Sequence, residues 1–160
     1  QEGRGTTIQI RLPLTLAIID GFLTTVGDTH YVAPLESVVE CIETPEACRA
    51  AGERGNGYFD LRGEVLPYVD LRRHFRTRGS APARQSMVIV RTDRTKVGLL
   101  VDRLLGQHQT VIKPLSRVFQ QLRGIAGSTI LGSGEVALVL DVNALVAGVH
   151  HNVNKGATAR

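Results

Sequence analysis

The feature that most constrains the fold of this chain is an internal repeat. The segment FLTTVGDTHYVAPLE, residues 22–36, aligns without a gap with VIVRTDRTKVGLLVD, residues 88–102, at an offset of 66. The segment GYFDLRGEVLPYVDL, residues 57–71, aligns with STILGSGEVALVLDV, residues 128–142, at an offset of 71. Two such matches in the same order predict two copies of one unit, each about 65 residues long.

Most of the repeated unit has the pattern of β-strands, because aliphatic runs are separated by turn residues such as Gly27-Asp28 and Gly63-Glu64. Pro67 lies inside one run and indicates an edge strand or a bulge. Short helices are expected over residues 70–78 and 115–122, and one helical turn within the loop 46–57. The expected strands cover residues 12–26, 30–35, 37–44, 58–61, 65–71, 87–92, 96–105, 110–113, 128–131 and 135–142.

These strands predict an all-β fold of two pseudo-symmetric five-stranded barrels with short helices. A sheet of about 65 residues buries little apolar surface unless it curls closed, so two small barrels packed on each other are expected. We place the first barrel at residues 14–80 and the second at 84–146, with a polar hinge between them and a flexible tail at 147–160. The pattern leaves open where the barrels exchange strands, since residues 14–20 could complete either one.

Composition excludes several classes of protein. A hydrophobic share of 42% with 21% charged residues is typical of a globular chain, and the net charge of +4 is only mildly basic. The longest apolar run, residues 136–140, is far below the roughly 20 residues that span a bilayer, so no direct membrane insertion is expected. No Met opens the chain, and we expect it to be a piece of a longer protein.

The sequence contains no pattern that indicates catalysis. Cys41 and Cys48 have no second cysteine pair or nearby histidine to form a zinc site, and two structural thiols are typical of a reducing cytosol. The five histidines are scattered, and no nucleophile elbow or phosphate-binding loop is present. We therefore expect no catalytic residue, no metal and no cofactor in this chain.

One basic run raises the alternative of a small nucleic-acid-binding barrel. Residues 72–78 contain four arginines, but Phe75 is the only aromatic residue among them. Base stacking needs exposed aromatic rings, and the strands carry aliphatic residues instead. The run is interpreted as a solvated helix end, no nucleic acid is expected as a partner, and binding is expected through aliphatic surface.

Two stretches of the sequence follow recognisable motifs, DLRGEVLPYVDLR at residues 60–72 and VGLLVD at residues 97–102. They match Asn/Asp-Leu-Arg-Gly-x-Val-x-Pro-x-Val-Asp-Leu-Arg and Val-Gly-Leu-x-Val-Asp, and so resemble the regulatory domain of bacterial chemotaxis histidine kinases (CheA), a domain similar to the adaptor protein CheW. The segments GQHQTVIKPL at 106–115 and IAGSTILG at 125–132 resemble the kinase type, and residues 5–18 resemble the junction that follows the ATP-binding domain. The resemblance covers about residues 5–146.

The resemblance implies two five-stranded barrels of Src-homology-3 type, which agrees with the repeat. It further implies a cytoplasmic scaffold domain at membrane-associated chemoreceptor arrays, with a CheW-type adaptor and the tips of methyl-accepting chemotaxis proteins as partners. Residues 1–13 would be the end of the ATP-binding domain, and the parent chain a histidine protein kinase of a two-component system. ATP and Mg would then bind only in the upstream kinase domain, which would autophosphorylate. A stand-alone CheW-like adaptor remains the alternative within the family.

The same resemblance implies candidate site residues. The adaptor family pairs a strand glutamate with the arginine of Leu-Arg-Gly, and these positions match Glu40 and Arg62, expected as a buried or half-buried pair or else as a surface ion pair. Partner contacts in the family lie near positions that match Val38, Gly57, Leu104 and Gln107, of which Val38 and Leu104 could equally belong to the core.

Overall fold

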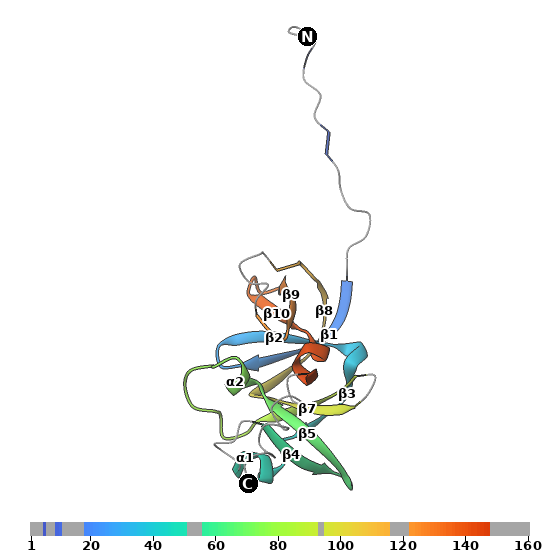
Figure 1. Ribbon diagram of the computed structural model, residues 1–160. Coiled ribbons are helices and arrows are strands. Elements are labelled where there is room, and N and C mark those ends of the chain that lie inside the picture. Colours follow the sequence, from blue (N-terminus) through green and yellow to red (C-terminus); the bar gives the residue numbers. More distant parts are fainter. Residues whose placement is uncertain are drawn as a thin grey trace.

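The computed structural model describes residues 5, 9–10, 18–50, 56–92, 95–115 and 122–147. The chain is mostly β, with short helices between or after strands (Figure 1). Its helices are the 3-10 turn η1 (Leu35–Ser37), α1 (Glu46–Ala50), α2 (Leu71–His74) and a helical segment at 142–147. The strands are β1 (Ile18–Val26), β2 (Thr29–Pro34), β3 (Val38–Glu43), β4 (Asn56–Leu61), β5 (Glu64–Asp70), β6 (Ser86–Arg91), β7 (Lys96–Val101), β8 (Arg103–Val111), β9 (Ile125–Ile130) and β10 (Val136–Leu140).

The strands form two five-stranded sheets, as the repeat predicted. The first sheet has the order β8-β1-β2-β10-β9, and the second has the order β3-β6-β7-β5-β4. In Figure 1 the first sheet occupies the upper part of the molecule and the second the lower part. The two orders are equivalent under the repeat, because β6 and β7 stand in the second sheet where β1 and β2 stand in the first. The all-β fold with two similar five-stranded units is therefore confirmed.

The predicted division into residues 14–80 and 84–146 is wrong. The second sheet is one contiguous stretch, β3 to β7, whereas the first sheet combines β1 and β2 with β8 to β10 from the far end of the chain. The reason lies in the connections. Only η1 separates β2 from β3, and only Asp102 separates β7 from β8, so each strand pair of one copy continues into three strands on the other sheet. The run 96–105, expected as one strand, accordingly breaks at Asp102.

Register follows the repeat, with one insertion. Leu61 pairs with Glu64 across a two-residue turn in the β4–β5 hairpin. In the β9–β10 hairpin the backbone N–H of Leu131 donates to the carbonyl of Glu135 at 2.8 Å, which leaves three residues in the turn. The offset is thus 71 between β5 and β10 but 70 between β4 and β9. The second match, predicted to align without a gap, therefore needs a one-residue gap in the hairpin turn.

Each edge strand that pairs with β1 or β6 carries a β-bulge at the same place. The β1–β8 register shifts between Leu23 and Thr24, which pair with Gly106 and Leu104 and leave Leu105 as the extra residue. The β3–β6 register shifts between Val38 and Glu40 and leaves Val39 as the extra residue. Val39 and Leu105 are 66 residues apart in the chain, so the bulge belongs to the repeated unit.

The apolar side chains form one central cluster between the sheets and one cluster inside each barrel. On β6, Met87 and Ile89 point into the second barrel, whereas Val88 and Val90 join the central cluster. Leu23 and Val32 lie in the cluster of the first barrel. Both faces of these strands are buried, which explains why their sequences are continuous apolar runs rather than an alternation.

Pro67 does not mark an edge strand or a bulge, contrary to the expectation from sequence. It lies on β5, an internal strand, where it pairs with Tyr58 of β4. The parallel ladder between β5 and β7 covers only Tyr68 to Asp70, so the N–H that proline lacks is not needed on that side.

Equivalent aspartates begin the helices that follow β5 and β10. The Asp70 carboxylate accepts hydrogen bonds from the backbone N–H of Arg72 at 2.9 Å and of Arg73 at 3.4 Å. The Asp141 carboxylate accepts one from the N–H of Ala144 at 2.9 Å. The helical segment 142–147, which lies between the sheets in Figure 1 and was not predicted, adds buried residues to the central cluster. The predicted helix over 115–122, the strand over 12–17 and the tail after 147 fall largely or wholly outside the described residues.

Candidate interaction surface

The six candidate residues lie on both sheets. Val38 and Glu40 are on β3, Gly57 is on β4 and Arg62 is in the β4–β5 turn, all on the second sheet. Leu104 and Gln107 are on β8, the edge strand of the first sheet. Since β3 and β8 are equivalent under the repeat, four of the candidates lie on the same edge strand of two similar barrels, whereas Gly57 lies on β4, the opposite edge strand of the second sheet.

Glu40 and Arg62 form the ion pair that the resemblance implied. Arg62 Nη2 donates to Glu40 Oε2 at 2.7 Å and Arg62 Nη1 donates to Oε1 at 3.3 Å, a two-pronged contact. The Arg62 side chain is 74% exposed and that of Glu40 is 28% exposed, so this is a surface ion pair with one half-buried partner. Its contribution to the free energy of unfolding is below about 1 kcal/mol. It joins β3 to the β4–β5 hairpin across the open edge of the second barrel.

The β4–β5 turn that presents Arg62 has unusual backbone geometry. Arg62 has φ 54° and Gly63 has φ 87°, the left-handed pair of a two-residue hairpin turn. The Asp60 carboxylate accepts a hydrogen bond from the N–H of Gly63 at 3.1 Å and fixes the turn. The guanidinium is therefore held over β3 by the backbone as well as by its partner.

Val38 and Leu104 occupy equivalent positions and have the same environment. Both are half-buried and pack against the central apolar cluster. Gly57 is also half-buried, and a Cβ at this position would lie 3.0 Å from Cε1 of Tyr68. Gln107 is exposed and stands opposite Phe22 in the β1–β8 pair. The structure brings Glu40 and Arg62 into contact, and the binding roles of all six residues stay predictions.

Four exposed aliphatic residues, which were not predicted from the sequence, form two equivalent pairs. The bulged residues Val39 and Leu105 are 44% and 45% exposed. Val65 on β5 and Val136 on β10, which are 71 residues apart, are 67% and 60% exposed. A position-by-position comparison of the two copies shows that each position is aliphatic in both, a pattern that buried positions share. Each barrel thus carries the same pair of exposed aliphatic side chains.

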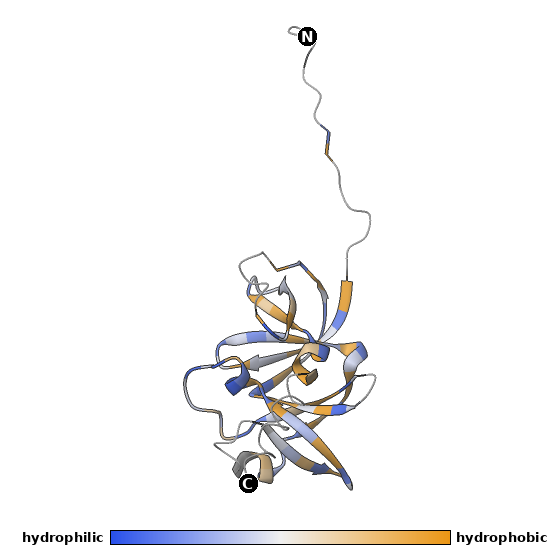
Figure 2. Cartoon of the chain, viewed as in Figure 1, coloured by the Kyte–Doolittle hydropathy of each residue, from blue (hydrophilic) through white to orange (hydrophobic). Residues whose placement is uncertain are grey.

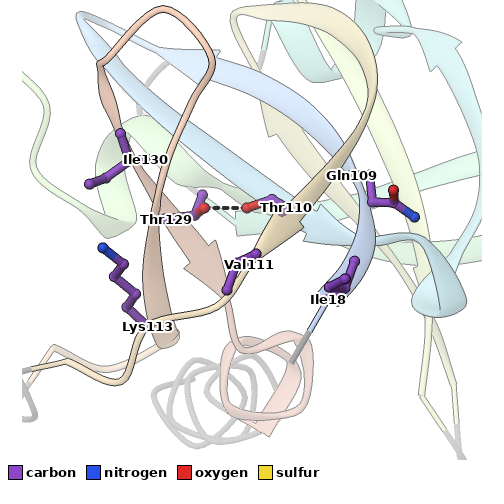
Figure 3. A pocket seen from close by; sticks show the side chains of 7 residues that line it. All are labelled: Ile18, Gln109, Thr110, Val111, Lys113, Thr129 and Ile130. Atoms are coloured by element: carbon purple, nitrogen blue, oxygen red, sulfur yellow. Dashed lines mark hydrogen bonds between the residues drawn. The ribbon is translucent and has the colours of Figure 1, made fainter. Parts of the chain in front are cut away.

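The open end of the first barrel contains a cleft of about 380 Å³. Figure 3 shows its lining, in which Ile18, Val111 and Ile130 surround the hydroxyl contact between Thr110 and Thr129. Two backbone hydrogen bonds between Lys113 and Ser128, of 2.8 and 2.9 Å, join the segment that follows β8 to β9 beside the cleft. Gln109 and Lys113 also line the cleft, so the end of this barrel presents both aliphatic and polar side chains.

The described residues offer little for chemistry. Burial raises the pKa of the Cys41 thiol, and the Glu40 carboxylate raises it further, so thiolate formation at this position is disfavoured. Burial also raises the pKa of Cys48. In the described ranges, no group of three or more His, Cys, Asp or Glu side chains is arranged to hold a metal ion. None of the helices in this part of the chain combines the length and apolarity needed to cross a bilayer.

Comparison with known families identifies the fold. The family of CheW-like domains matches residues 20–150, which is most of the chain. The chain belongs to the CheW-like domain family. The resemblance drawn from the motifs along the chain is therefore confirmed.

The relatives of this CheW-like domain are chemotaxis proteins. The chain is 43% identical to the chemotaxis protein CheA of Klebsiella aerogenes and 41% identical to that of Salmonella typhimurium, in each case over 91% of its length. It is 36% identical to the sensor histidine kinase CheAY of Helicobacter pylori, again over 91%. It spans 22%, 22% and 18% of these three proteins, so it matches their CheW-like region and not a catalytic domain.

A solved structure shares the fold. The scaffolding protein TtCheW from Thermoanaerobacter tengcongensis superposes with a TM-score of 0.65 at 18% identity, covering 78% of this chain and 89% of that one. At this identity the likeness concerns the fold alone. It agrees with two small barrels of Src-homology-3 type.

Proposed function

We propose that this CheW-like domain is the regulatory and scaffold domain of a chemotaxis histidine kinase, and that it binds a CheW-type adaptor and the cytoplasmic tips of chemoreceptors. The observation that supports this most directly is the repeated pair of exposed aliphatic residues, Val39 with Val65 and Leu105 with Val136. Two similar barrels that expose similar apolar residues suit a domain that bridges two protein partners.

The proposal favours a kinase domain over a stand-alone adaptor. Identities of 41–43% to CheA proteins stand against 18% to the CheW structure. In the parent protein, ATP and Mg would bind in a separate kinase domain, which would autophosphorylate. This domain would then couple receptor state to that activity at cytoplasmic arrays beneath the membrane.

Binding is expected to be weak at each surface and strong in the assembly. A small barrel end buries on the order of 1,200 to 1,600 Å² in total with its partner, which commonly supports micromolar affinity in signalling complexes. Because the second barrel offers another surface, a second contact benefits from a raised effective concentration. Repetition of such contacts builds rings or lattices.

Titration calorimetry with the CheW-type adaptor of the same organism tests the proposal. The expected result is micromolar binding that one of the two variants Leu105→Asp and Val39→Asp abolishes while the fold is retained, because these partly exposed bulge residues lie on different barrels. Arg91→Asp, at an exposed position on β6, is the control and is expected to bind like the wild type. Nanomolar affinity from one site, or no binding by the folded wild type, contradicts the proposal.

A further inference from the structure

The stretch from α2 through β6 carries a strong positive charge. From Leu71 to Thr92 the chain carries six arginines and no Asp or Glu. Figure 2 shows α2, at the start of this stretch, among the most hydrophilic parts of the molecule. We propose that residues 76–84, here named the arginine loop, are a docking site for an acidic segment of a partner polypeptide. None of the arginines of this loop is among the residues proposed to bind the adaptor, although Leu105, which is one of those residues, lines a cleft beside the loop.

The first two arginines of the stretch are already neutralised. Arg72 is buried and forms an ion pair with the buried Asp102. Arg73 lies 3.6 Å from the Asp70 carboxylate. Arg76, Arg78 and Arg84 are exposed, and the structure shows no ion pair for them within its described ranges. Their charge is therefore available to an external anion.

The arginine loop has a fixed backbone. Arg72 Nη2 donates to the carbonyls of Arg78 at 3.0 Å and of Gly79 at 2.8 Å, so the buried guanidinium holds the loop from beneath. The N–H of Thr77 donates to the carbonyl of Arg72 at 2.7 Å. Arg76 and Gly79 adopt left-handed φ angles of 52° and 83°, which turn the chain tightly. A backbone that is already ordered loses less conformational entropy when a partner binds.

The loop also packs against the first sheet. A Cβ on Gly27, in the β1–β2 turn, would lie 2.5 Å from Cγ2 of Thr77, which shows how closely the two segments approach. A cleft of about 510 Å³ lies beside the loop and is lined by residues of both segments and by the bulged Leu105. Asp28 is the exposed carboxylate on its rim, where Arg103 is also found. The site therefore consists of three exposed arginines on a fixed loop, beside a cleft whose own lining contains both acidic and basic side chains.

The geometry favours carboxylates of a protein over a nucleic acid. Guanidinium groups bind carboxylates and phosphates alike through two parallel hydrogen bonds, so charge alone does not decide. Single-stranded nucleic acids need exposed aromatic rings for stacking. The ring nearest in sequence, Phe75, is instead stacked on Tyr31 at 4.8 Å and packs against the central cluster. The arginine loop thus offers charge without a stacking platform.

Fluorescence anisotropy with a labelled peptide of alternating glutamate and glycine tests this inference. The wild-type chain is expected to bind the peptide at low salt and to release it as salt rises. Arg76→Gln with Arg78→Gln should weaken binding about five- to tenfold, because two exposed guanidinium–carboxylate contacts are lost. Arg91→Gln with Lys113→Gln removes the same charge from exposed positions elsewhere and should change binding less than about twofold.

Three outcomes overturn the inference. These are no binding by the wild type, equal weakening by both double variants, and tighter binding of an oligothymidylate of the same length than of the peptide. The Arg76 and Arg78 variant should retain the wild-type circular dichroism, since the loop carbonyls bound by Arg72 remain. It should also bind the CheW-type adaptor as the wild type does, so failure here is distinguishable from failure of the proposed function.

Discussion

The two sheets share their strand order and register but fill their barrels in opposite ways. In the first sheet Gly21 lies beneath Val32, and a Cβ on Gly21 would lie 2.2 Å from Val32 Cγ1. The equivalent positions in the second sheet are Met87 and Gly98, and a Cβ on Gly98 would lie 2.5 Å from Met87 Sδ. The large residue comes from the second strand in one barrel and from the first strand in the other. Each barrel therefore places one larger residue against one glycine, and the two copies differ only in which strand carries the larger residue.

Between the two copies of the repeat, the polar contacts differ more than the apolar contacts do. The ion pair between Glu40 and Arg62 has Gly106 and Gly132 at the equivalent positions of the first sheet, where no ion pair is possible. The buried pair of Arg72 and Asp102 corresponds to Asn143 and Glu36, which are exposed. Apolar pattern and turns thus define the shared fold, whereas the ion pairs are specific to one copy.

The largest effect is expected from Asp102→Ala. This change leaves the buried Arg72 guanidinium without its carboxylate and also removes the acceptors of the Gly27 N–H and the Gln85 amide. We expect a loss of about 3 to 5 kcal/mol in the free energy of unfolding, measured by urea denaturation. Glu36→Ala, the equivalent change in the other copy, should stay within about 0.5 kcal/mol. If Asp102→Ala and Glu36→Ala lower the free energy of unfolding by the same amount, the two copies do not differ at this position.

The second-largest effect is expected from alanine substitution of Gly21 and Gly98, which should lower the free energy of unfolding by different amounts in the two copies. Gly21→Ala meets the stiff β-branched Val32, which has no room to turn, and should cost about 2 to 3 kcal/mol. Gly98→Ala meets the flexible thioether of Met87 and, at 3.0 Å, Cε1 of Phe59; because the closest atom can move, the change should cost about 1 to 2 kcal/mol. Thermal unfolding of both variants measures the difference. A larger cost at Gly98 would contradict the packing comparison.

Arg62→Ala should have a small effect on stability. Since Arg62 is 74% exposed, its ion pair with Glu40 should contribute less than about 1 kcal/mol, below what a buried pair would give. Lys96→Ala, which breaks the exposed pair with Glu64, is the matched control on the same sheet. Adaptor affinity should fall for Arg62→Ala but not for Lys96→Ala if the β4–β5 turn supports docking. If Arg62→Ala and Lys96→Ala lower the affinity for the adaptor by the same amount, Arg62 does not belong to the candidate surface.

The smallest effect concerns the cap at Asp70. Burial raises the pKa of the Asp70 carboxyl above 3.8, although hydrogen bonds from the N–H of Arg73 and Arg72 act against it. The folded state therefore binds this proton more tightly than the unfolded state. The resulting stabilisation is present at pH below 3.8 and is lost as pH rises through the folded pKa.

Asp70→Asn keeps a good helix cap without this titration. As the pH rises from below 3.8 through the folded pKa of Asp70, the wild type should lose stability relative to the variant by less than about 1 kcal/mol. Urea denaturation at several pH values measures this difference. Asp141→Asn, at the equivalent cap, controls for the exchange of aspartate for asparagine. A wild type that gains stability relative to the variant as pH rises contradicts the stated direction.

The fold class could be predicted from sequence because both copies carry the same strand and turn pattern. The exchange between sheets could not, since Val38 and Leu104 are equivalent and β1 would pair equally well with β3 or β8. Only the short connections decide between these pairings. The contact of Glu40 with Arg62 followed from family resemblance. The exposure of Val39 was missed because the alternation of β3 runs through it and conceals the bulge.

The two crossings at η1 and Asp102 have a mechanical consequence. A pair of domains joined by one linker can swivel about it, but these barrels are joined by two short connections, of three residues and of one. Asp102 is further anchored to the β1–β2 turn through the N–H of Gly27 at 2.7 Å. Two attachment points leave only the line between them as an axis of rotation, and the central apolar cluster shared by both sheets opposes rotation about that line. A torque applied to one barrel is therefore transmitted to the other.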